Sequence, residues 1–416
     1  MRSERVVLTG RGIVSPLGVG IEQHCEALAS GRSAVAALPR LALLGEGTPR
    51  AAEITADVLS PHLARLPRKQ QKLYNRATLL GMLASSLAME DAGLVPGAGD
   101  PARLGVVVGV NVLTWALDAM TQYLAAAESR EHPGTLDMAV ANAFCMRGIN
   151  PLDYSLKTLP NLAAGHLAIT HDARGACRAL TDGSTGGAQA IGQAFRMIQE
   201  REVDVVLCGG ADAPLDELLF ASTYGSGSST DAQGSAHPLL GEGSGILVLE
   251  DAHHARARGA RVYGEVLAFA SVAGAGRFYT DEEPAALAAR VARAVSAAVA
   301  EAEGTPDLIC PHGDGLPSHD QAEIEALTRS FGDGASAIPT IRMKMAHGDL
   351  GAAGAPVEFL ACSMALQEGK MRSWNSGLTA KPRQTETSHR ALLISLGQFG
   401  ECAALMLAGP GERDAG

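Results

Sequence analysis

The chain has 416 residues, of which 46% are hydrophobic and 19% charged, so it can bury a large core and is not disordered as a whole. Aromatic residues make up 4% and the formal net charge is −11, which argues against nucleic acid as a main partner. The seven scattered cysteines form no CxxC pair, so neither a disulfide framework nor a thiolate zinc site is expected. The sequence shows no signal segment and no apolar run near about 18 residues, so we expect a cytoplasmic protein without membrane contact.

Short apolar strands alternate with alanine-rich helical stretches along the chain. In chain order, the expected strands are residues 5–8, 104–108, 203–207, 245–249, 262–266, 308–309, 391–395 and 403–407. The expected helices are residues 79–92, 189–200, 251–258 and 285–302. Continuous apolar strands that alternate with helices are typical of parallel-rich sheets covered by helices on both faces.

A strand begins again at residues 262–266, just after a charged helix, and the order that follows resembles the order at the start of the chain. This pattern indicates an internal duplication whose two halves meet near residue 255. We therefore place one half at residues 1–255 and the other at residues 256–416.

Three motifs that would indicate other chemistries are incomplete. Residues 9–15 begin like a dinucleotide-binding loop but lack its third glycine. Residues 182–186 resemble a GxSxG nucleophile elbow, but Asp182 stands in place of the first glycine. One C-terminal stretch is rich in histidine and aspartate, yet its spacing matches no common metal site, so we predict no metal and no cofactor. Its residues are His312, Asp314, His319 and Asp320.

Several other stretches share their order and residue pattern with one known family. They are residues 6–18, 159–169, 190–192, 204–214, 241–245, 312–313 with Asp320 and Glu323, and 351–354. Together they resemble the β-ketoacyl-acyl-carrier-protein synthases over almost the whole chain. The resemblance implies the duplicated thiolase-like α/β fold, with five layers in the order α/β/α/β/α, and chemistry on acyl chains held by a carrier protein.

The resemblance also assigns the family's catalytic positions. The nucleophilic cysteine falls on Ser184, and the first histidine falls on His312. The family lysine falls on Lys344, but the stretch that follows is one residue shorter than the family pattern. The second histidine is therefore either absent, with Gly348 in its place, or shifted to His347.

An oxygen at position 184 changes the chemistry that the site permits. A cysteine thiol has a pKa of about 8.5, which falls readily at a helix start, whereas a serine hydroxyl is a far weaker acid and needs an adjacent base. An acyl-serine is also less reactive toward a carbon nucleophile than a thioester. The sequence thus resembles a synthase without its condensing apparatus, which within the family is the mark of the chain-length factor. That factor is the β-subunit of type II polyketide synthases.

The resemblance to a chain-length factor implies an acyl tunnel and two partners, a ketosynthase subunit in a heterodimer and an acyl carrier protein. The tunnel candidates are Val112, Trp115, Ala116, Met120 and, in place of the family's gating phenylalanine, Gly397. Trp115 is a candidate to close the tunnel, with ordinary core packing as the alternative. Residues 178–183 are the expected edge strand at the dimer. Three basic residues are candidates for contact with the carrier or the partner, with a solvated helix end as the alternative. They are Arg68, Lys69 and Arg76.

The favoured function is therefore a chain-length-factor-like subunit that shapes the tunnel for a polyketide, or polyene, chain while its partner condenses malonyl units. A second hypothesis is a stand-alone serine-variant acyltransferase or thioesterase that uses Ser184 and His312. The third hypothesis is a plain homodimeric ketosynthase, which the missing cysteine disfavours. Residual decarboxylation through His312 and Lys344 is a further interpretation of the site.

Overall fold

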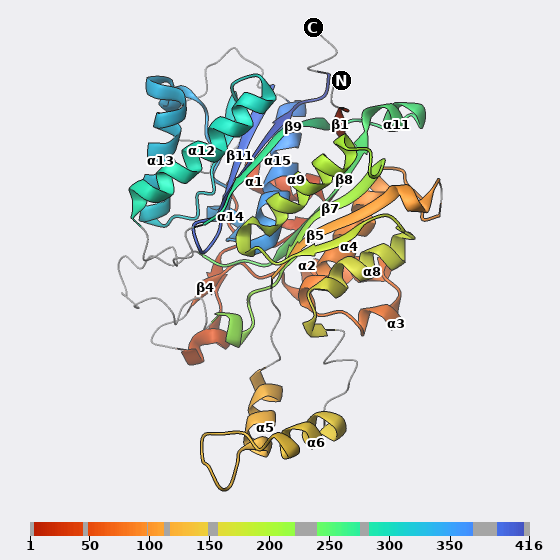
Figure 1. Ribbon diagram of the computed structural model, residues 1–416, viewed down its shortest axis with the longest axis vertical. Coiled ribbons are helices and arrows are strands. Elements are labelled where there is room, and N and C mark those ends of the chain that lie inside the picture. Colours follow the sequence, from red (N-terminus) through yellow and green to blue (C-terminus); the bar gives the residue numbers. More distant parts are fainter. Residues whose placement is uncertain are drawn as a thin grey trace.

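The structure is a computed structural model that describes residues 4–44, 49–97, 99–111, 117–148, 157–220, 239–274, 283–368 and 389–411. Ten of the described strands form one sheet in the order β10-β11-β12-β9-β1-β8-β7-β5-β6, with β2 paired to β1 (Figure 1). The short strands β3 (Ala36–Ala37) and β4 (Arg50–Ala51) form a separate two-stranded sheet. The first half of the chain contributes β1 (Val6–Ser15), β2 (Gly18–Val19), β5 (Leu104–Val110), β6 (Cys177–Leu180), β7 (Val205–Asp212) and β8 (Gly243–Asp251). The second half contributes β9 (Gly264–Val272), β10 (Leu308–Cys310), β11 (Arg390–Leu396) and β12 (Cys402–Ala408).

The sheet contains the same four-strand pattern twice. In the order β5-β7-β8-β1 the first pair is parallel and the next two are antiparallel. The order β10-β11-β12-β9 repeats these three relations. The two copies join where β1 pairs with β9 in antiparallel fashion, and β6 is added at the outer edge of the first copy. The internal duplication read from the sequence is therefore present in the sheet.

Helices complete five layers around the two copies, in the α/β/α/β/α order that the family resemblance implies. The outer layer on the first copy holds α4 (Arg76–Asp91) and α8 (Asn161–His171), and the outer layer on the second holds α12 (Pro284–Ala302), with α13 (Pro317–Phe331) behind it. The central layer holds α9 (Gly186–Gln199) and α15 (Gly354–Glu368). Both central helices contact strands of the two copies, so the core lies on either side of them.

Strand β1 runs to Ser15, well beyond the end expected at Thr9-Gly10, because the glycines of the incomplete dinucleotide motif serve packing. A Cβ atom at Gly12 would overlap the backbone carbonyl of Ala84 in α4, and one at Gly10 would overlap that of Ala88. The glycines thus let the strand pass directly beneath the helix. This contact accounts for the motif without a bound nucleotide.

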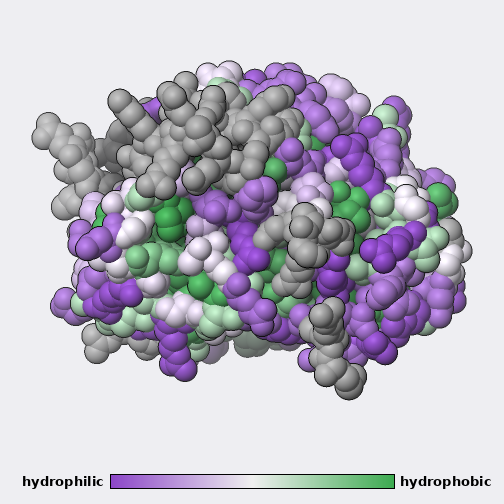
Figure 2. All heavy atoms as spheres, turned by 90° about the horizontal axis from the view of Figure 1, so that it is seen from above, coloured by the Kyte–Doolittle hydropathy of each residue, from purple (hydrophilic) through white to green (hydrophobic). Residues whose placement is uncertain are grey.

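Helices α5 (Leu117–Ala127) and α6 (Met138–Gly148) pack on each other and stand apart from the sheet (Figure 1). Large apolar side chains are exposed on this pair of helices and on the segment between them. They are Leu117, Leu124, Leu136, Met138, Val140 and Met146. Hydrophilic and hydrophobic side chains are interspersed on the face shown in Figure 2. Among the described helices, none has the length and apolar character needed to cross a bilayer.

Buried histidines should make the fold sensitive to acid. Burial lowers the pKa of His171 to about 4, and burial together with the charge of Arg32 lowers that of His24 to about 3. An unfolded chain protonates histidine near about pH 6.5 and so binds more protons than the folded chain below that pH. We expect the free energy of unfolding, measured by urea denaturation, to fall between pH 6.5 and pH 4.

A matched pair of variants checks the source of this loss. The His171→Gln variant should lose about 2 kcal/mol less than the parent chain between pH 7 and pH 4.5. His253 is exposed, so His253→Gln should leave the loss unchanged. Equal losses in the parent and in His171→Gln would contradict the assignment.

Candidate functional site

Polar side chains from both copies of the sheet pattern meet at the carboxyl ends of the strands. Ser184 lies half-buried in a short turn, Gly183–Thr185, at the start of α9, and His312 follows β10. Both line one cavity of about 60 Å³. The other lining residues include Asn111, Asp212, Asp314, His319, Asp349, Leu396 and Gly397. The structure thus brings together the two residues that the sequence paired as nucleophile position and histidine.

Adjacent residues at the end of β11 hold Ser184 and His312 in place. The hydroxyl of Ser395 donates to the Ser184 carbonyl oxygen over 3.1 Å, and the amide of Leu396 donates to His312 Nδ1 over 3.3 Å. The backbone amide of His312 donates in turn to the buried carboxylate of Glu323 on α13, over 2.7 Å. Burial raises the pKa of Glu323.

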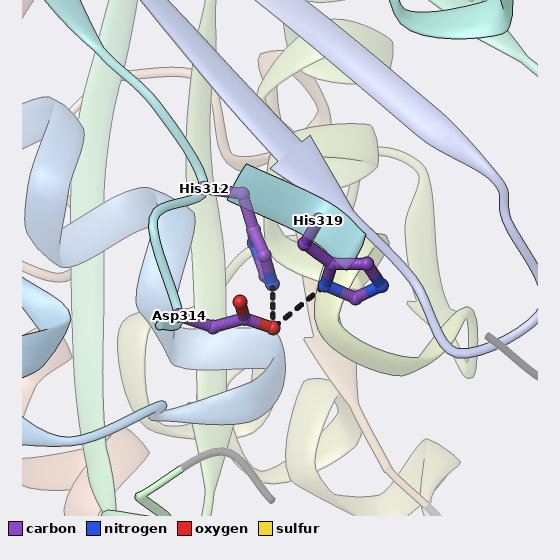
Figure 3. A group of neighbouring side chains, drawn as sticks. All are labelled: His312, Asp314 and His319. Atoms are coloured by element: carbon purple, nitrogen blue, oxygen red, sulfur yellow. Dashed lines mark hydrogen bonds and ion pairs between the residues drawn. The ribbon is translucent and has the colours of Figure 1, made fainter. Parts of the chain in front are cut away.

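Three buried side chains form a cluster beside Ser184. The rings of His312 and His319 both point toward the carboxylate of Asp314 (Figure 3). His312 Nε2 lies 3.4 Å from Asp314 Oδ2, and His319 Nδ1 lies 2.7 Å from the same oxygen. Burial opposes the charge of Asp314, but its contacts with the two histidines prevail and hold its pKa well below the usual range. Burial likewise opposes the charge of His319, but Asp314 outweighs it and raises the pKa of that ring.

The segment that follows the family lysine contributes a carboxylate to the cavity lining, and not a second histidine. The short helix α14 (Lys344–His347) ends with His347 fully buried beside His24, 5.6 Å between ring centroids, and away from the cavity lining. Gly348 follows in a left-handed conformation (φ 77°), and Asp349 lines the cavity. Burial holds the pKa of His347 well below the usual value, so its ring is neutral.

Lys344 is engaged in an ion pair outside the cavity lining. Its ammonium donates to Glu358 Oε1 on α15 over 2.8 Å, and both side chains are buried. Burial alone would lower the pKa of Lys344, but the carboxylates of Glu358 and Asp349 outweigh it and raise that pKa. The lysine therefore stays charged at neutral pH.

A larger cavity of about 660 Å³ adjoins the smaller one and shares four lining residues with it, Asn111, Asp212, Pro214 and Gln398. Burial raises the pKa of Asp212 to about 7. A Cβ atom at Gly397 would overlap the Glu401 carboxylate, so the space beside this glycine is already occupied by an acidic side chain. Among the described lining residues of both cavities there are carboxylates and histidines but no lysine or arginine. The carboxylates belong to Asp182, Asp212, Asp314, Asp349 and Glu401.

The remaining predicted residues lie elsewhere. Met120 is on α5, apart from both cavities, and the tunnel candidates Val112, Trp115 and Ala116 fall outside the described residues. The basic residues divide into two groups. Two of them, Arg68 and Lys69, are exposed on α3 (Arg68–Gln71), whereas Arg76 donates to Glu242 over 2.6 and 3.0 Å within the chain.

Sequence reasoning did not select several residues that the cavities contain. Asn111 and Asp212 stand at or just after the ends of two parallel strands. This position in the sequence could have identified them as candidate site residues. Asp314 and His319 were weighed only as metal ligands. Their contact arises because α13 turns back over the loop after β10, which their spacing alone does not reveal.

Comparison with known proteins gives the class that this architecture and site define. The model of the β-ketoacyl synthase N-terminal domain matches residues 3–255, and that of the C-terminal domain matches residues 263–374. The chain therefore belongs to the β-ketoacyl synthase family.

Its relatives include polyketide ketoacyl synthases and a 3-oxoacyl-[acyl-carrier-protein] synthase 2 of Synechocystis sp.. The tetracenomycin polyketide synthase ketoacyl synthase alpha subunit of Streptomyces glaucescens is 31% identical over 88% of this chain and 85% of its own. A putative polyketide beta-ketoacyl synthase 1 of Streptomyces halstedii is 30% identical over 99% of both chains. A solved structure of the ishigamide ketosynthase/chain length factor has a TM-score of 0.78, at 24% identity over 98% of this chain and all of that one. At that identity the likeness concerns the fold alone.

Proposed function

We propose that this chain is the chain-length-factor-like, non-condensing subunit of a type II polyketide β-ketoacyl synthase and that it acts in the cytoplasm. The partner ketosynthase condenses malonyl units carried by an acyl carrier protein, and this chain shapes the space for the growing product. The observation that carries the proposal is the cavity itself. Ser184 lines it at the position of the family's nucleophile, and so does Asp349, which follows the family lysine in the sequence. Histidine is the only side chain in its described lining that can carry a positive charge.

Two surfaces support a partner subunit. Strand β6 pairs only with β5 among the described strands, and Cys177 and Arg178 are exposed on it. An open strand edge is a ready template for a strand of another chain. The apolar side chains exposed on α5 and α6 need cover that the described residues of this chain do not provide. A related solved structure is described as a type II polyketide synthase carrier protein in complex with its ketosynthase, which supports the proposed carrier.

The alternative is a stand-alone acyltransferase or thioesterase of the same fold. It is favoured by one observation, that Ser184 and His312 line the same cavity. It is opposed by the contacts of His312, whose two ring nitrogens already face Leu396 and Asp314.

Co-expression with a cysteine-bearing ketosynthase and a carrier protein separates the two functions. We expect the two chains to purify together, and Ser184→Ala to leave product formation within about twofold of the parent, since the nucleophile lies in the partner. Replacing the partner's active-site cysteine by alanine should abolish the product.

Three results would contradict the proposal. The chain alone could transfer acyl groups, Ser184→Ala could abolish turnover, or mass spectrometry could find a long acyl group bound to this chain during turnover. Each would favour the serine-variant enzyme instead.

A further inference from the structure

We infer that Asp314, supported by His319, is a positioning residue that takes the hydrogen-bond donor of His312 away from position 184. An anion formed at that position is thereby left facing a carboxylate. The inference rests on the proposed non-condensing function and names the residues that keep the cavity inactive.

The tautomer of His312 follows from its backbone contact. A neutral imidazole carries one N–H and one lone pair. The amide of Leu396 donates to Nδ1, so the lone pair lies on Nδ1 and the proton lies on Nε2. That N–H faces Asp314 Oδ2 at 3.4 Å. His312 in this arrangement has no lone pair to accept a proton from Ser184, and its single donor is directed at Asp314.

Asp314 is held in place by further donors. The amide of Leu316 donates to Oδ1 over 3.0 Å, and His319 Nδ1 donates to Oδ2 over 2.7 Å. Asp314 and His319 are both buried, so water screens the pair little. A carboxylate with three donors stays ionised, and its negative charge is uncompensated wherever the His319 ring is neutral.

Two further carboxyl groups, Asp212 and Asp349, line the same cavity. Burial raises the pKa of Asp212 to about 7, so this group is only partly ionised at neutral pH. His312 and His319 are the titratable nitrogen groups of the described lining. Acyl transfer forms an anion at the nucleophile and then an oxyanion at the carbonyl, and both need donors close by. The arrangement therefore opposes covalent chemistry even if a sulfur atom is restored at position 184.

A metal ion is the main rival explanation of the cluster, because the three potential ligand atoms lie within 4.8 Å of one another. Two histidines and one carboxylate are a known ligand set. A metal would take the lone pair of His312 Nε2 and place the proton on Nδ1, where a metal-bound histidine donates to an acceptor. Here Nδ1 faces a donor, the amide of Leu396, so the contacts favour the hydrogen-bonded cluster.

The experiment measures the reactivity of a thiol placed at position 184. Iodoacetamide is added to Ser184→Cys, and the alkylation rate of that peptide is followed by mass spectrometry from pH 6 to pH 10. Peptide mapping separates the introduced thiol from the exposed Cys177. We expect the introduced thiol to titrate above its ordinary pKa of about 8.5. Adding Asp314→Asn removes the charge and should raise the rate at pH 7.5 about tenfold, and Asp314→Ala should raise it further by freeing the N–H of His312.

Asp320→Asn provides the control, because Asp320 follows His319 on α13, pairs with Arg342 and is absent from the cavity lining. It should leave the alkylation profile unchanged. The inference is overturned if the introduced thiol titrates at or below about pH 8.5 with Asp314 intact, or if neither change at Asp314 alters the profile. Stoichiometric zinc in native mass spectra of the parent, lost in Asp314→Asn, would overturn it in favour of the metal. The assay needs no partner subunit, so its failure is distinct from failure of the proposed heterodimer.

Discussion

Replacing Lys344 by methionine is expected to lower the free energy of unfolding by about 3–5 kcal/mol, because the change leaves the Glu358 carboxylate buried without its counter-charge. Both side chains are almost completely buried, and their 2.8 Å contact joins α14 to α15 in the middle of the molecule. Urea denaturation at pH 7 measures the loss.

The double variant Lys344→Met with Glu358→Leu separates the pair from the packing around it. Removing both charges should restore most of the lost stability and bring the protein within about 1–2 kcal/mol of the parent. A loss below about 1 kcal/mol in the single variant would mean that the ammonium is not needed to balance Glu358. In that case a role for Lys344 in residual decarboxylation would gain support.

The Gly12→Ala variant is expected to lose about 3 kcal/mol or more, since its methyl group would overlap the carbonyl oxygen of Ala84. Neither group is the flexible end of a side chain, so β1 or α4 must move. That movement would disturb the packing of the strand that joins the two copies of the sheet pattern. The change in denaturation midpoint, with the slope checked for constancy, reports the loss.

Gly165→Ala is the matched control for this substitution. Gly165 lies within α8, and a Cβ atom there would meet no atom of the described residues within 4 Å. The same chemical change should therefore stabilise the protein by about 0.5–1 kcal/mol through helix propensity. Similar losses at both glycines would contradict the steric explanation.

The sequence allowed the strands and the duplication to be predicted because both depend on local apolar patterning. The second copy of the sheet pattern begins with β9, and its restart was visible in residues 262–266. The predicted end of β1 was wrong. Glycine usually weakens a strand, but here the glycines of β1 allow the close approach of α4. That reason lies in tertiary packing and has no local signal.

The site was predictable only where a motif assigned a position. Ser184 and His312, to which the resemblance assigns the nucleophile position and the first histidine, line one cavity. The second histidine position could not be resolved, because a one-residue gap has no fixed place in a sequence. The structure resolves the geometry, since α14 ends at His347 and the left-handed turn at Gly348 brings Asp349 to the cavity. The cluster of Asp314 and His319 depends on the return of α13 and could not be read from spacing.

The two hydrogen bonds that Ser395 and Leu396 donate at the end of β11 have a consequence for synthesis on the ribosome. Ser395 holds the carbonyl of a residue 211 positions earlier, and Leu396 holds a ring 84 positions earlier. A nascent chain in which β11 has not yet left the ribosome therefore lacks the hydrogen bond from Ser395 to the Ser184 carbonyl oxygen. The cavity can form only after β11 has been synthesised, so truncated products ending before residue 390 would lack it.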